Sequence, residues 1–212
     1  KLRRRLSANV KVETLDRNSV AESKRLSELM DMAKYLNYFY KASYELKHVP
    51  TELPEEEVEK AWDEIEDEKL KMSNIYNVMS IPTKMEILGH SRDDWSTFYA
   101  LTAEEIEQLT AVEHNRWCVE RLIQGMRPCT DEERQEIEED LRKRLSDKSY
   151  AREYPVSLKK KYKNERNAHY DLCAFSELGV DETGLPVTRY DRDLTAAIPL
   201  IVKTFNDRQK NG

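Results

Sequence analysis

One stretch of the chain, residues 110–128, concentrates the side chains whose types and spacing could do chemistry. Glu113, His114, Arg116 and Trp117 form its centre. Residues three or four positions apart lie on neighbouring parts of one helix face, so these side chains share a face or adjoin one another. A solvated helix face seldom carries a His, a Trp and Arg side chains among matched acids. We therefore expect this face either to be buried in a polar network or to bind a ligand.

The same residues raise the question of an active site. Nucleophilic catalysis needs an activated Ser or Cys beside a base that an acid orients. No strand-turn-helix G-x-S-x-G motif is present, and Cys118 lies inside the predicted helix. No H-x-x-x-H spacing indicates a metal site, and no G-x-G-x-x-G or P-loop motif indicates a nucleotide cofactor. We predict no enzyme, no catalytic residue, no metal ligand and no cofactor; an enzyme acting on a nucleotide-derived substrate is the least favoured alternative.

One interpretation of the polar face is structural: a buried network that joins the central helix to the last one. Buried charges must be paired, because an unpaired charge taken out of water is strongly destabilising. Arg binds carboxylates through a planar fork that Lys cannot copy. The residues expected in such a network are Glu113, Arg116, Glu120, Arg121, His169, Asp191 and Arg192.

The other interpretation is a pocket for a small anionic ligand, such as a nucleotide-derived signal. Arg side chains would bind its phosphate groups, and aromatic rings would stack on a base. Ser and Asn are unfavourable inside a helix unless they hydrogen-bond something, which adds Ser73 and Asn74 to this set. The candidate ligand-binding residues are Ser73, Asn74, His114, Arg116, Trp117, Arg121, Arg127 and His169.

The helix that must position this face begins at a capping box, Thr102 with Glu105, and we expect it to run to about Met126. Gly125 and Pro128 supply the stop signals. Other helices are expected over residues 20–46, 54–79, 84–88 and 131–145, with a last one capped by residues 190–193 and one short strand over residues 9–15. The pattern predicts a mainly α fold of antiparallel helix pairs with a few short strands.

Composition limits the class of protein. The 212 residues are 36% charged and include only 5 Gly, which favours helices over Gly-rich nucleotide-binding folds. The formal net charge of -6 argues against a nucleic-acid partner. Three Cys without C-x-x-C spacing fit a reducing compartment. No segment has the roughly 20 apolar residues of a membrane span, and no secretory signal is present, so we predict a cytoplasmic location.

The helix expected over residues 20–46 is rich in aromatic side chains towards its end, at Tyr35, Tyr38, Tyr40 and Tyr44. Such a stripe is typical of a hydrophobic core or of a subunit interface. We therefore expect a homo-oligomer, in its simplest form a dimer, with this helix as the contact. A purely structural oligomerisation module is accordingly the main alternative to a ligand sensor.

Three ordered elements of the chain resemble the ryanodine-receptor (RyR) repeat domain of the bacterial type. The elements are E-H-N-R-W at residues 113–117, then Asn167 and His169 with Leu172 and Leu178, then Y-D-R at residues 190–192 before a helix. The likeness covers about residues 101–208, and Phe175 stands near where the family often has Trp. The resemblance implies paired helices with a few short strands, no established catalytic activity, and a structural or regulatory role.

The segment around Ser73 to Lys84 also looks like the one that precedes this domain in bacterial proteins. Some of those proteins carry a nucleotide-binding domain further upstream, sometimes after membrane spans. We therefore divide the chain into an N-terminal helical segment, residues 1–69, and an RyR-repeat-like domain, residues 70–212. The chain begins with Lys1, so we expect a piece of a larger bacterial protein in which it acts as a regulatory or sensory module. The resemblance allows a membrane-tethered parent protein.

Overall fold

The computed structural model describes residues 20–44, 49–91 and 99–211, and these are mainly helical, which confirms the mainly α part of the predicted fold class. The segment at residues 9–15, expected as a strand, lies outside the described residues. The elements are α1 Val20–Tyr44, α2 Glu55–Asp63, α3 Glu68–Met79, α4 Ile81–Ile87, α5 Ala103–Ile123, β1 Arg127–Pro128, α6 Asp131–Ser146, α7 Lys148–Glu153, α8 Leu158–Arg166, β2 Ala168–His169, α9 Thr188–Ala196 and α10 Ile198–Asn211.

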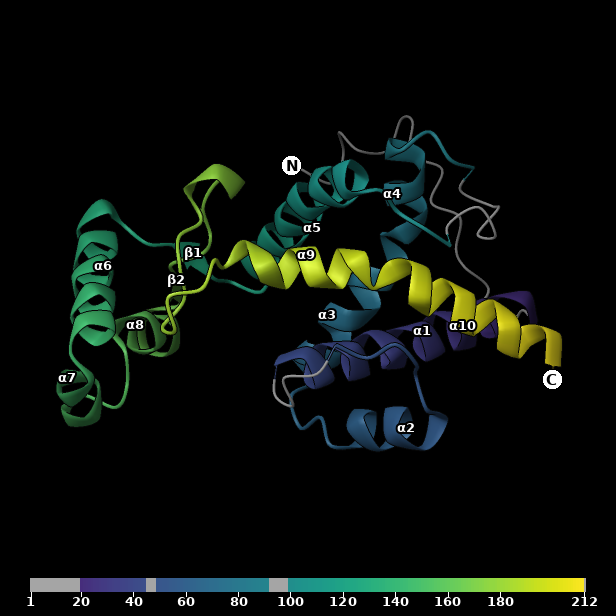
Figure 1. Ribbon diagram of the computed structural model, residues 1–212, viewed down its shortest axis with the longest axis horizontal. Coiled ribbons are helices and arrows are strands. Elements are labelled where there is room, and N and C mark those ends of the chain that lie inside the picture. The colour runs from purple at the N-terminus through teal and green to yellow at the C-terminus, as the bar shows by residue number, and fades with distance from the viewer. Residues whose placement is uncertain (1–19, 45–48, 92–98, 212) are drawn as a thin grey trace, which may run out of the picture.

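Figure 1 shows two lobes. The main lobe contains α1 to α5 together with α9 and α10, and the small lobe contains β1, α6, α7, α8 and β2. The chain leaves the main lobe after α5 and returns to it at α9. The long helix α5 therefore stands where the two lobes meet, and its last turns face the small lobe (Figure 1).

One hydrophobic core holds the main lobe together. It draws side chains from α1, α2, α3, α4, α5 and α10, so the predicted boundary after residue 69 does not separate two cores. Tyr35 and Phe39 of α1 are buried in this core, and the ring of Tyr44 lies 4.6 Å from that of Tyr190 in α9. The aromatic side of α1 is thus covered by its own chain, and the dimer contact through this helix stays a prediction.

The small lobe has its own core, formed by Ile137, Leu141, Tyr162, Ala168 and Tyr170. Its two short strands pair in parallel, with Arg127 opposite Ala168 and Pro128 opposite His169. Asn167 ends α8 in the left-handed region at φ 52°, a conformation that Asn tolerates better than most residues. This pairing ties the exit of α5 to the segment that carries His169.

The single helix expected over residues 54–79 is wrong, because the chain breaks into α2 and α3. The Asp67 side chain accepts a hydrogen bond from the backbone N–H of Lys69 and caps a new helix. Asp is a strong N-cap residue, so Asp67 competes successfully with a continuous helix. The break lets α2 fold back against α1 while α3 packs under α5.

The expected start of the last helix is also wrong. Residues 190–193 do not cap it, because α9 already begins at Thr188 and Asp191 lies in its first turn. The helical path is then interrupted at Ala197, and Pro199 stands in the first turn of α10, where its missing N–H costs least. Asp191 therefore lies within α9, where its carboxylate faces His114 of α5.

The central helix is predicted well at its start. Thr102 and Glu105 form the expected capping box, with reciprocal hydrogen bonds of 3.2 and 2.7 Å. The helix ends at Ile123, three residues earlier than expected, and Gly125 follows with φ 86°. None of the helices in the described part of the chain is both long and apolar enough to cross a membrane.

Candidate functional site

The buried face of α5 is polar. Glu113 and His114 each keep 1% of their surface exposed, whereas Leu122 and Ile123 keep 49% and 81%. A helix that followed its apolar residues inward would have buried the opposite side. Glu113, His114 and Glu120 are therefore directed at neighbouring elements of the chain, where they need partners.

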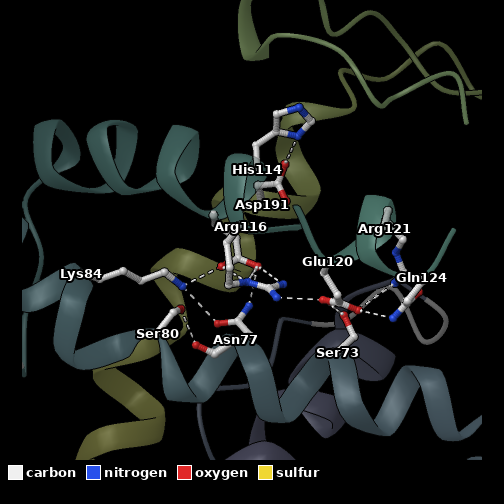
Figure 2. Close-up of polar contacts among 11 residues, drawn as sticks. Ser73, Asn77, Ser80, Lys84, His114, Arg116, Glu120, Arg121, Gln124 and Asp191 are labelled. Carbon is white, nitrogen blue, oxygen red and sulfur yellow. Dashed lines mark hydrogen bonds and ion pairs between the residues drawn. The ribbon is translucent and has the colours of Figure 1, made fainter. Parts of the chain in front are cut away.

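Glu113 is the centre of a buried network, and its partners Asn77, Lys84 and Arg116 are labelled in Figure 2. Its carboxylate accepts from Lys84 Nζ at 2.7 Å, from Asn77 Nδ2 at 2.8 Å, and from Arg116 at 2.7 to 3.0 Å. Lys84 also donates to Asn77 Oδ1 at 3.1 Å, which orients the amide. Asn77 and Lys84 come from α3 and α4, so the network joins three helices.

Glu120 extends this network about two turns along α5. It accepts from Arg116 NH1 at 2.8 Å, from Ser73 Oγ at 3.0 Å and from Gln124 Nε2 at 3.0 Å. Arg121 NH1 donates to Gln124 at 2.9 Å, but its NH2 lies 3.7 Å from the Glu120 carboxylate. Ser73 thus has a structural partner inside the chain, and Arg121 is held less closely than Arg116.

The Glu113 network, defined as Ser73, Asn77, Lys84, Glu113, Arg116 and Glu120, balances its charges. Every nitrogen of the Arg116 guanidinium donates to a carboxylate. Burial alone would raise the pKa of Glu113, but Lys84 and Arg116 hold it below its usual range. Burial also lowers the pKa of Lys84, against the opposing pull of Glu113; the 2.7 Å contact between them favours the ionised pair.

His114 faces hydrogen-bond acceptors with both ring nitrogens. Nδ1 lies 3.3 Å from Asp191 Oδ2, and Nε2 lies 2.9 Å from the Cys173 carbonyl and 3.3 Å from Cys118 Sγ. A neutral imidazole has one N–H, so it would turn a lone pair toward one of these oxygens. Burial opposes the charge, but Asp191 and then Cys118 and Cys173 raise the pKa of His114 to about 10. Burial raises the pKa of Asp191, with His114 opposing it, and the acceptors on both ring nitrogens favour the imidazolium form of His114.

His169 is neutral, in contrast to His114. Its Nδ1 accepts from the backbone N–H of Asp171 at 3.2 Å, which requires an unprotonated nitrogen. Burial lowers the pKa of His169 to about 4, and the cations nearby add to that effect. Trp117 lies between the two histidines, with its ring 5.9 Å from His114 and 4.9 Å from His169.

Around His169 lies a set of cations that we name the basic cluster: Arg121, Lys159 and Lys163. Arg121 stacks over the Trp117 ring at 5.6 Å, and Lys159 pairs with Asp171 at 2.8 Å. The side-chain ammonium of Lys163 makes no hydrogen bond or ion pair with any residue in the ranges that the structure describes. Loss of solvent and then the Arg121 charge lower the pKa of Lys163. The cluster thus holds more positive charge than its own carboxylate neutralises.

The remaining predicted residues lie elsewhere. Arg127 forms a two-pronged ion pair with Glu133 at 2.7 and 2.8 Å in the small lobe. Arg192 pairs with Glu107 on the surface rather than with the buried network. Asn74 donates to Asn37 of α1 at 3.3 Å. Of the candidate ligand-binding residues, the structure brings Trp117, Arg121 and His169 together around the basic cluster.

Four residues of these sites are not among the site residues predicted from the sequence: Asn77, Lys84, Lys159 and Lys163. Lys84 is 0% exposed, and its apolar neighbours Ile81 and Met85 on the same short helix are 1% and 0% exposed. A Lys at an apolar position of a short helix is a signal for a buried ion pair, which sequence reasoning could have used. Lys163 sits in a basic run, where nothing local marks it from its neighbours.

A metal site and a surface hollow are the two other kinds of site to weigh against the basic cluster. The described residues contain no group of three or more His, Cys, Asp or Glu side chains that could hold a metal ion. A hollow of about 620 Å³ lies between residues 51–55 and α10, lined by Leu53, Leu200 and Arg208 among others. None of the candidate ligand-binding residues lines this hollow, so we give it less weight than the convergence of charge near Trp117.

The comparisons with known proteins add no assignment. No protein-family model matches the chain, and neither a curated protein nor a solved structure matches it. The arguments for function therefore rest on the side chains of the Glu113 network, the two histidines and the basic cluster.

Proposed function

We propose that this chain is a non-catalytic sensory module of a larger bacterial protein, and that it binds a small anionic, nucleotide-like ligand at the basic cluster. The observation that carries the proposal is the unpaired ammonium of Lys163 beside Arg121. We take the module to be a cytoplasmic RyR-repeat-like domain of antiparallel helix pairs with a few short strands, in a parent protein that is free or membrane-tethered.

The chemistry of the basic cluster fits a phosphate group better than it fits a neutral ligand. Arg121 offers a planar fork and Lys163 a compact charge, and both are donors that phosphate oxygens accept. Trp117 and the neutral ring of His169 supply aromatic surfaces for a base. These rings and cations come from α5 in the main lobe and from α8 and β2 in the small lobe.

This placement gives the ligand a way to act. A ligand held by Arg121 and Lys163 touches both lobes at once, and it would favour the arrangement in which the two cations lie closest. The energy for that shift is the difference in its affinity between lobe arrangements. Arg121 and Lys163 repel each other in the unliganded chain, and a bound anion would reduce this repulsion.

Arg116 is a poor ligand residue by comparison. Its guanidinium already serves Glu113 and Glu120, so a ligand would have to displace a buried carboxylate. The sequence left two roles open for the polar face of α5, a structural network and a ligand pocket. We assign Arg116, Ser73 and Asp191 to the structural network.

Isothermal titration against a panel of nucleotides, cyclic nucleotides and inorganic phosphate tests the proposal. We expect one member to bind below millimolar and Lys163→Ala to weaken it by about tenfold, the value of one lost charged hydrogen bond. Lys160→Ala is the matched control, because Lys160 is exposed on the same helix. The proposal fails if nothing in the panel binds below millimolar, or if both variants weaken binding equally.

A protein-interaction module is the second candidate. Val119, Leu122 and Ile123 are 56%, 49% and 81% exposed on the last turns of α5, and they form one apolar patch on adjoining positions of the helix. Analytical ultracentrifugation at high concentration separates the candidates, because a monomer counts heavily against self-association. A dimer that Ile123→Glu dissociates would favour this patch over the aromatic helix α1.

A further inference from the structure

Cys118 lies in a polar arrangement that is separate from the basic cluster. Its sulfur is 3.3 Å from Nε2 of His114, one turn back on α5, and 4.0 Å from the Cys173 carbonyl. The other ring nitrogen of His114 faces Asp191 of α9 at 3.3 Å. A cysteine, an imidazole and an orienting carboxylate thus stand in sequence, and Cys118 is partly exposed.

The charge on His114 decides what this arrangement does to the sulfur. An imidazolium N–H shared between a carbonyl oxygen and a sulfur places positive charge beside Cys118. A neighbouring cation stabilises a thiolate, and the thiolate is the nucleophilic form of cysteine. Asp191 keeps the ring both oriented and protonated, as the acid does in nucleophile–base–acid arrangements.

The other two cysteines have different surroundings. Burial raises the pKa of Cys129, and the nearby Glu133 carboxylate adds to that effect. Burial also raises the pKa of Cys173, with Arg134 opposing it. Both thiols are partly exposed, as Cys118 is, so they provide controls of similar access inside the same chain.

We propose that Cys118 is a peroxide-sensitive thiol, with His114 as the proton donor for its oxidation and Asp191 as the residue that positions His114. The site would take hydrogen peroxide or a small organic hydroperoxide. It goes beyond the ligand site at the basic cluster, and it does not depend on that site.

The chemical step balances with groups present in the chain and the named oxidant. The Cys118 thiolate attacks one oxygen of the peroxide, a sulfur–oxygen bond forms and the oxygen–oxygen bond breaks. The leaving hydroxide or alkoxide takes the Nε2 proton of His114 and departs as water or an alcohol. Sulfur is oxidised to a sulfenic acid and the peroxide is reduced.

The test is competitive labelling of the intact 212-residue chain. The chain is treated with limiting hydrogen peroxide in the presence of dimedone, which traps sulfenic acids, and the three cysteine peptides are quantified by mass spectrometry. We expect about tenfold more label on Cys118 than on Cys129 or Cys173, since its sulfur lies against an imidazole that a carboxylate orients. Equal labelling of the three cysteines would overturn the proposal.

Two further measurements separate the proposal from simple exposure. Asp191→Asn should lower labelling of Cys118 several-fold, whereas Asp193→Asn, which alters the partner of Tyr44 on the same helix, should leave it unchanged. Equal effects of the two variants would also overturn the proposal. In guanidinium chloride the three wild-type cysteines should label alike; a preference for Cys118 that survives unfolding would show that the folded arrangement is not its cause.

Discussion

The Glu113 network and the basic cluster both include residues of α5, yet their charges are balanced in one and unbalanced in the other. In the Glu113 network two carboxylates meet two cations, and each guanidinium nitrogen of Arg116 has an acceptor. In the basic cluster Lys159 pairs with Asp171 and Arg121 lies 3.7 Å from Glu120, whereas the Lys163 ammonium has no partner among the described residues. The same residue types therefore fix the fold in one place and leave a charge available in the other.

The difference between the two regions teaches how to separate stability from recognition. A buried charge must be neutralised by the chain itself, because a ligand that is sometimes absent cannot do so without unfolding it. A charge near the surface can stay unpaired at little cost, since water screens it. Lys84 is fully buried and paired, whereas Lys163 is exposed and unpaired.

The largest effect is expected from removing the centre of the Glu113 network. Glu113→Ala leaves Lys84 and Arg116 as buried cations that repel each other, and we expect a loss of about 3–5 kcal/mol in the free energy of unfolding. Chemical denaturation followed by circular dichroism measures the loss. A variant that does not fold at all agrees with the expectation.

Glu139→Ala is the matched control for this prediction. It removes an ion pair to Lys143 of 2.8 Å, but both side chains are more than half exposed. An exposed pair of this kind contributes under about 1 kcal/mol. If the two Glu variants cost the same, the Glu113 network is not the buried, balanced unit described above.

The next effect concerns the two histidines beside Trp117. NMR titration of their ring protons should give a pKa of about 10 for His114 and of about 4 for His169. Asp191→Asn should bring the pKa of His114 down toward its ordinary 6.5 and leave that of His169 unchanged. A pKa of His114 below 6.5 in the wild-type chain would contradict the assignment of an imidazolium.

The two shifts predict opposite pH dependences of stability. The pKa of His114 is raised on folding, so its contribution is complete below pH 6.5 and is lost as the pH rises toward about 10. The pKa of His169 is lowered, so its contribution is complete above pH 6.5 and is lost as the pH falls toward about 4. Urea titrations across this range should give the largest sum of these two contributions to the free energy of unfolding near pH 6.5.

The sequence predicted much of α5 and little of its surroundings. The capping box at Thr102 fixes where the helix begins, because that signal is local. Pairing of Glu113 with Arg116 follows from helical spacing in the same way. The partners Lys84 and Asn77 lie about 30 residues away, and no periodicity within α5 points to them.

The same limit explains the errors in the fold. Local signals that favour continuing a helix compete with signals that end it at Asp67 and at Ala197, and periodicity alone does not decide between them. The position of His169 beside Trp117 depends on the parallel pairing of β1 with β2, a contact between strands of two residues each. Strands that short carry no recognisable alternation, so the sequence alone cannot place them.

The smallest expected effect sharpens the comparison from the other side. Lys163→Ala removes a cation that repels Arg121 and has no acceptor of its own, so the free energy of unfolding should stay within about 0.5 kcal/mol of wild type or rise slightly. Charge removal in the Glu113 network should instead be strongly destabilising. Thermal melts at low and high salt measure the difference: any gain from Lys163→Ala should shrink as salt screens the repulsion. A loss above 1 kcal/mol would mean that Lys163 supports the fold and is not a charge left available for a ligand.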